Sequence, residues 1–195
     1  MHKLKTTNMK NLLITILFAC LISSCKTKNE GNTTELSQNS SEILFQVKTN
    51  DKDELEIFED GIIPWISIKN PESEINNLIG KDEIVINKSN VILIIDYPLN
   101  NPVEIKIKSE NSNGFTRKEL AQKISTEYNR IYKEEEESAN TKTTPIDERQ
   151  GLINRNQTDG KYGIWGHDID DLDLSAIILR KTENGEIKLE LMVES

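Results

Sequence analysis

Cysteine is almost absent from this chain of 195 residues, which has only Cys20 and Cys25. Residues 26–195 therefore form no disulfide and offer no thiol to a metal ion. They contain one histidine, His167, and they show no glycine-rich phosphate loop, dinucleotide fingerprint or Ser-x-x-Lys motif. From these absences the sequence predicts no cofactor and no resident metal, and it marks no nucleophile.

Long apolar runs are also missing, because the longest, Leu12–Ile22, is shorter than the roughly 20 residues that span a bilayer. The run follows three lysines and ends in Ser23-Ser24-Cys25. A basic start, an apolar middle and small residues at the end are the layout of a secretory signal. A plain secretory signal would need no cysteine at this place. With Ile22-Ser23-Ser24-Cys25 as the lipobox, the segment resembles a bacterial lipoprotein signal.

The resemblance covers about the first 25 residues and implies a location, not an activity. It implies that residues 1–24 are removed and that Cys25 is acylated, which places the protein in the bacterial cell envelope. We expect lipid anchorage at the outer membrane, on its periplasmic or surface face. The polar stretch that follows cannot offset the entropy of ordering, so residues 25–41 are expected to be the acylated cysteine and a flexible tether. Residues 42–195 have the length of a single domain.

Positive charge is scarce in the expected mature chain. Residues 1–24 hold three lysines and no acid, which leaves 21 basic and 33 acidic residues, a formal net charge of −12. Nucleic acid is therefore excluded as a partner, because phosphate binding draws on clustered lysine and arginine. Membrane attachment would come from the lipid anchor. A basic protein or a cation is the partner that the charge favours, although acidity can also serve solubility alone.

Alternating apolar residues predict a domain built mainly of strands. We expect strands at 43–47, 55–58, 62–68, 84–86, 91–95, 103–107, 172–179 and 187–193. Residues 84–95 are expected to form one hairpin, and a type I′ turn at Asn184-Gly185 is expected to close another. The strand at 91–95 is apolar on both faces, which predicts a central place in the sheet.

One long helix is predicted over 116–137, and a short one over 71–79. Thr116 and Glu119 form a capping box, and Leu120, Ile124, Tyr128 and Ile131 make one apolar stripe. The acidic run Glu134–Glu137 opposes the helix dipole and is expected to be a solvated, frayed end, or else a cation or partner site.

The fold class predicted is therefore α+β, an antiparallel or mixed sheet with the long helix packed on one face. The predicted core consists of Phe45, Ile57, Ile94, Ile105, Leu120, Ile124, Tyr128, Ile131, Ile178 and Leu189.

The candidate binding site is the segment 165–173, which follows a long stretch of little periodicity. Its residues are Trp165, His167, Asp168, Asp170, Asp171 and Asp173, to which we add Arg155 from the preceding loop. Imidazole and carboxylates are ligands of hard or borderline metals, but the spacing matches no zinc or calcium motif. Arg149 and Arg155 are expected to pair with the aspartates, or else to bind a carboxylate ligand.

Two functions follow from these observations. The first is a membrane-anchored, non-enzymatic binding module, for example an acidic inhibitor or immunity protein. The alternative is a metal-assisted hydrolase centred on His167 and the aspartates.

Overall fold

The computed structural model describes residues 41–150 and 154–195. The expected signal, Cys25 and all but the last residue of the expected tether lie outside the described residues. Among those described, no helix combines the length and the apolar character that crossing a membrane requires.

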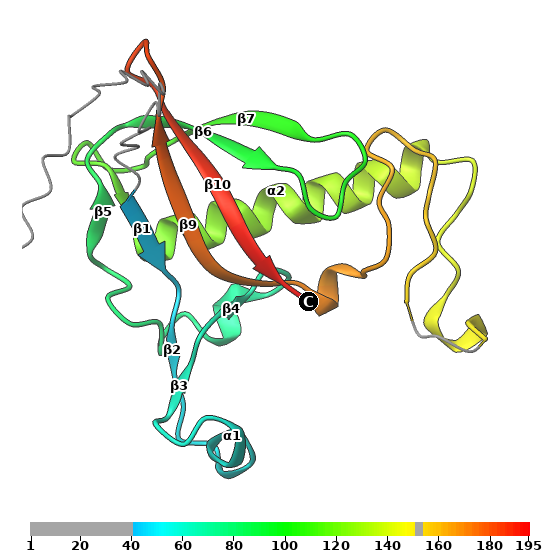
Figure 1. Cartoon of the computed structure of the whole chain (residues 1–195), viewed down its shortest axis with the longest axis horizontal. Helices are drawn as coiled ribbons and strands as arrows, with labels where there is room; N and C mark the ends of the chain where they lie inside the picture. The colour runs from blue at the N-terminus through cyan, green and yellow to red at the C-terminus, as the bar shows by residue number, and fades with distance from the viewer. Residues whose placement is uncertain (1–40, 151–153) are drawn as a thin grey trace, which may run out of the picture. The chain divides into compact units, whose positions relative to one another are not determined.

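The fold is α+β, as predicted, with a mixed sheet and one long helix (Figure 1). The six-stranded sheet has the order β1 (Ser41–Leu44), β9 (Asp173–Lys181), β10 (Ile187–Glu194), β6 (Asn90–Ile95), β7 (Val103–Lys108), with β4 (Ile66–Ser67) paired to β9. Two small sheets pair β2 (Val47–Lys48) with β3 (Ile62–Ile63) and β5 (Ile84–Ile86) with β8 (Phe115–Thr116). The helices are α1 (Lys52–Ile57) and α2 (Arg117–Ser138), with short 3-10 turns η1 (Pro71–Ser73), η2 (Ile146–Glu148) and η3 (Ile169–Asp171).

Strand β6 lies inside the sheet, parallel to β10 and antiparallel to β7, which confirms its predicted central place. The expected hairpin with residues 84–86 is wrong, because β5 pairs with β8 instead. A run that is apolar on both faces can take two strand partners, and sequence proximity does not decide which strands these are.

Helix α2 confirms the predicted helix and packs its stripe on one face of the sheet. The Thr116 hydroxyl caps the Glu119 N–H at 3.2 Å. Glu119 does not complete the capping box, since its carboxylate accepts from the Glu110 N–H at 2.7 Å and the Ser109 hydroxyl at 3.3 Å. That acid therefore joins α2 to the end of β7.

The C-terminal hairpin of β9 and β10 is confirmed, but its turn is not the two-residue form. The Gly185 N–H donates to the Thr182 carbonyl at 2.9 Å, and Gly185 itself has a φ of +83°. A turn ending in a left-handed glycine is the three-residue loop with a bulge.

Six of the ten predicted core residues are buried: Phe45, Leu120, Ile124, Tyr128, Ile131 and Leu189. Ile94, Ile105 and Ile178 are only partly buried, and Ile57 is 73% exposed. The register places Ile94 opposite Glu104 and Ile178 opposite Glu190. Ile94 and Ile178 thus share a face of the sheet with charged residues.

Two predicted elements are different in the structure. Residues 71–79 form the 3-10 turn η1 and further turns rather than a helix. Residues 55–58 belong to α1 and its end rather than to a strand. Asp51 caps α1 by accepting from the Asp53 and Glu54 N–H groups, and acids in a first turn favour the helix.

Candidate functional site

The predicted segment 165–173 leads from the long loop into β9 and includes η3. The backbone joins it to its surroundings through bridges between Leu99 and Ile164 and between Arg155 and Gly166. The segment is thus built into the domain.

Asp168 lies between the two predicted arginines. Arg149 donates to both of its carboxylate oxygens, at 2.6 and 3.0 Å, and the Arg155 Nε lies 3.8 Å away. The hydrogen bond with Asp168 raises the pKa of Arg149, whereas burial lowers that of Arg155. Arg155 also donates to the Ile164 carbonyl at 3.1 Å. The structure therefore shows the expected pairing of arginine with aspartate.

The remaining aspartates do not converge. Lys69 binds the carboxylate of Asp170, and the Asp171 carboxylate accepts the Asp168 N–H at 3.1 Å. Asp173 lies in β9, where burial, and then the charges of Glu74 and Glu194, raise its pKa to about 6. Across residues 41–150 and 154–195, no three histidine, cysteine, aspartate or glutamate side chains are placed to hold a metal ion. The geometry therefore does not favour the metal-assisted hydrolase.

Trp165 and His167 pack with Tyr97 as an aromatic cluster. The Tyr97 ring lies 5.3 Å from that of Trp165 and 5.6 Å from that of His167, between ring centroids. The Tyr132 hydroxyl donates to the His167 carbonyl at 3.0 Å. Trp165 remains 37% exposed. These contacts serve packing at the approach to β9.

Glu135, within the acidic run, is an unexpected centre of this region. Its side chain is fully buried and accepts from the Thr158 hydroxyl at 2.6 Å and from the N–H groups of Gly160, Tyr162 and Gly163 at 2.9, 2.7 and 3.1 Å. Burial alone would raise the pKa of this carboxyl, but the four donors lower it. The expectation of a frayed, solvated end is thus wrong at Glu135.

Its neighbour Glu134 is also used within the fold. Lys161 donates to it at 2.7 Å, the Tyr162 hydroxyl at 2.5 Å and Arg130 at 2.7 Å, and these bonds lower its pKa to about 2. Polar donors 23 to 28 residues further along the chain thus fold back onto the acidic end of α2. Two sequence features could have indicated this arrangement. One is the acidic run itself, and the other is the glycines, which let backbone N–H groups approach a carboxylate closely.

A second acidic region, which the sequence analysis missed as a site, is the excursion between β2 and β3. We call residues 47–63 the acidic finger. Its base is the pair of Val47 and Ile63, both buried, and it leaves the main sheet to carry α1 (Figure 1). Gly61, with a φ of +69°, lets the returning chain accept the Thr49 N–H at 2.9 Å.

The finger exposes an apolar side chain among carboxylates. Ile57 is 73% exposed, the largest exposed fraction of any large hydrophobic side chain that the structure describes. Asp53, Glu56 and Glu59 are exposed around it and form no ion pair within the described part of the chain. The Phe58 ring packs edge-on against the Trp65 ring, with 5.6 Å between the ring centroids. The finger thus presents Ile57, the less exposed Leu55 at 37%, and three carboxylates that have no ion pair among the described residues.

These features define an α+β domain with a tightly bonded loop region and an exposed acidic finger. Comparison with protein-family models, curated proteins and solved structures found no match to the chain. Its function is therefore inferred from geometry and chemistry alone.

Proposed function

We propose that this protein is a non-enzymatic binding module, lipid-anchored through Cys25 in the bacterial cell envelope, whose acidic finger docks a basic protein partner. An inhibitor or immunity protein directed at a basic toxin is the form of this role that the charge favours. The observation that carries the proposal is Ile57, exposed on the finger near three carboxylates that form no ion pair among the described residues.

The chemistry of the finger is that of a protein-binding surface. A large apolar side chain that enters a partner's pocket supplies affinity, and charges around it steer and orient the encounter. Between Asp51 and Asp60 the chain has six acids and one lysine, and Asp51, Glu54 and Asp60 are engaged locally. The three that remain, Asp53, Glu56 and Glu59, are available to a partner's lysines or arginines.

The region 165–173 supports a non-enzymatic role for a different reason. Asp168 and Asp170 are bound by basic side chains, Asp171 holds a backbone N–H, and Trp165 and His167 pack on Tyr97. These groups are committed to the fold.

The anchor is tested separately from the partner. Mass measurement of the mature protein should find residue 25 as the N-terminus with fatty acid attached, and the Cys25→Ser protein should leave the membrane fraction. Purified protein that retains residues 1–24 and carries no lipid would refute the anchored part of the proposal.

Partner binding is tested by crosslinking the anchored protein in its own envelope, with Ile57→Asp as the disruptive variant. The matched control is Ile146→Asp, because Ile146 is also exposed, at 61%, but lies in η2. We expect a basic protein whose recovery falls about tenfold for Ile57→Asp alone and falls steeply with added salt. A neutral or acidic partner, or equal losses for both variants, would contradict docking by the finger.

A further inference from the structure

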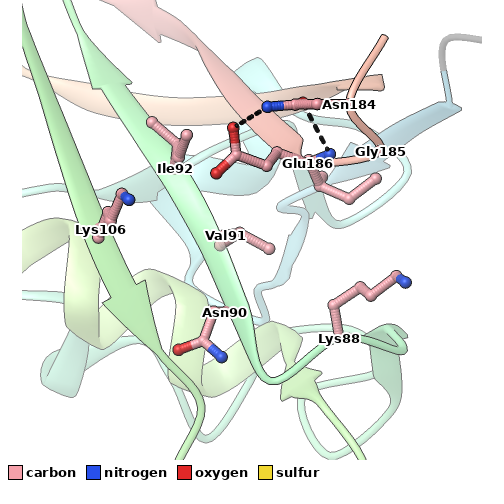
Figure 2. Close-up of a pocket in the computed structure, with 9 residues that line it drawn as sticks. Lys88, Asn90, Val91, Ile92, Lys106, Asn184, Gly185 and Glu186 are labelled. Atoms are coloured by element: carbon pink, nitrogen blue, oxygen red, sulfur yellow. Dashed lines mark hydrogen bonds between the residues drawn. The ribbon is translucent and has the colours of Figure 1, made fainter. Parts of the chain in front are cut away.

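A pocket of about 390 Å³ lies at one end of the main sheet, between the loop before β6, strand β7 and the β9–β10 hairpin (Figure 2). Val91 and Ile92, both buried, form an apolar wall. Lys88, Asn90 and Lys106 are exposed polar residues of its lining. The pocket therefore combines apolar surface with two ammonium groups and an amide.

The charges of the pocket are only partly neutralised. Lys88 and Lys106 form no ion pair within residues 41–150 and 154–195, whereas Lys188 on neighbouring β10 is paired with Glu104. One carboxylate, Glu186, lines the pocket, and it accepts from the Asn184 side chain at 2.8 Å (Figure 2). The two lysines leave a net positive lining in a strongly acidic chain.

The pocket lies at the end of the main sheet where the first strand, β1, begins. Ser41, the first residue of β1, pairs with Leu179 of β9. Two residues further along β9, Lys181 pairs with Ile187, which lines the pocket. Fifteen residues separate Ser41 from Cys25, a length that spans at most about 50 Å when extended. A lipid on Cys25 would therefore keep this end of the sheet within reach of the bilayer.

The acidic finger lies toward the other end. Strand β1 runs away from the hairpin turn and leads to β2, and β4, which follows the finger, pairs with the first residues of β9. The nine residues of β9 span about 30 Å. That is several times the Debye length of about 8 Å at physiological salt, so the charges of the finger are largely screened from the pocket.

We propose that the pocket takes the phosphate group of an anionic phospholipid in the membrane that carries the anchor. The Lys106 ammonium group and the Asn90 amide would donate to phosphate oxygens, and Lys88, which lies on the other side of β6 (Figure 2), would attract the anionic headgroup by its charge. The apolar wall would contact the glycerol portion of the lipid. The end of the sheet with the pocket then faces the bilayer, and the finger faces away from it toward a partner. The inference rests on the proposed anchorage but not on the finger's partner.

The test uses the full lipidated protein reconstituted in vesicles of phosphatidylcholine, with or without one-third phosphatidylglycerol. Sparse amine labelling, read for each lysine by mass spectrometry, reports which ammonium groups are covered. We expect labelling of Lys88 and Lys106 to fall about fivefold in the phosphatidylglycerol vesicles, and that of Lys52 on the finger to stay unchanged. Glu186→Gln should deepen the protection, because it removes the one carboxylate of the lining.

Three outcomes would overturn the proposal. Equal labelling in both kinds of vesicle would exclude headgroup binding, and equal protection of Lys52 would show non-specific adhesion. Protection by glycerol 3-phosphate in detergent, without any effect of phosphatidylglycerol, would make the pocket a site for a soluble phosphate ester. The intact mass measured on the same sample shows whether Cys25 is acylated, so failure of the anchor is distinguished from failure of the pocket.

Discussion

Two acidic stretches of this molecule differ in how their carboxylates are bonded. At the end of α2, Glu134 and Glu135 receive seven hydrogen bonds from Arg130 and from residues 158–163. On the finger, Asp53, Glu56 and Glu59 face water. The difference lies in what surrounds each carboxylate, since residues 158–163 lie against the end of α2 and bring donors to it.

The two groups of acids differ in their hydrogen-bond donors. A structural acid accepts hydrogen bonds from its own chain, whereas an available acid is exposed to water and could bind a partner. A buried carboxylate is stabilising only when hydrogen bonds replace its lost hydration. Glu135 meets that condition, because Thr158, Gly160, Tyr162 and Gly163 all donate to it. An exposed carboxylate beside an exposed isoleucine gains nothing within its own chain and is free to be used in binding.

Substitution of Glu135 should produce the largest loss of stability. Glu135→Gln puts an amide group where donors converge and leaves buried N–H groups without an acceptor, so we expect a loss of about 2–4 kcal/mol in the free energy of unfolding. Urea denaturation at pH 7 measures it. Because the folded pKa of Glu135 is lowered, its contribution is present above the ordinary pKa of 4.5 and disappears as the pH falls through the folded value.

The matched control is Glu137→Gln in the same acidic run. Glu137 is exposed and lies 3.9 Å from Lys133, so its substitution should change stability by less than about 0.5 kcal/mol. Equal effects of the two variants would remove the distinction between structural and available acids.

The sequence predicted what depends on local pattern. The period of Leu120, Ile124, Tyr128 and Ile131 gave the long helix and its buried face, and the doubly apolar run of β6 gave its central place. Both signals lie within one element, so no knowledge of distant residues is needed to interpret them.

What failed depended on contacts between distant residues. The pairing of β5 with β8 and the cradle around Glu135 join segments far apart in sequence. The finger was missed for a local reason, because Leu55-Glu56-Ile57-Phe58 alternates like a strand while Asp51 caps a helix. In the candidate site, pairing of Arg149 with one of the aspartates was expected, but the sequence could not show that Asp170 and Asp173 lie apart from that pair.

Asp168 is a second test of the difference between acids bonded within the fold and exposed acids, because it is a half-buried acid with strong donors. Asp168→Asn should lower the free energy of unfolding by about 1–3 kcal/mol, since it breaks the two-point bond with Arg149 and leaves a buried guanidinium without its acid. Thermal unfolding measures the loss. Arg149→Lys should retain part of the stability; a loss as large as that of Asp168→Asn would show that the guanidinium geometry is essential.

Asp173 is the opposite case, a partly buried acid whose pKa is raised. Its folded value of about 6 lies above the ordinary 3.8, so stability falls as the pH rises from about 4 to 6, and the ionised group remains unfavourable above that. Asp173→Asn should therefore stabilise the protein by about 1 kcal/mol at pH 7.5, less than the full shift implies because the group is partly exposed. At pH 3.5 the two proteins should unfold alike. Stabilisation that persists at pH 3.5 would point to packing rather than charge.

The smallest effect on stability is expected at the finger. Substitution there tests whether its acids serve partner binding rather than folding. Joint substitution of Asp53→Asn, Glu56→Gln and Glu59→Gln removes three exposed carboxylates that are unpaired in the described structure, so the free energy of unfolding should change by less than about 0.5 kcal/mol. The same protein should lose its basic partner, because the charges that steer the encounter are gone. Unfolding and recovery of the crosslinked partner are measured on one preparation. If the triple variant lost stability as Glu135→Gln is expected to, the acids of the finger would belong to the fold as those of α2 do, and binding would need another surface.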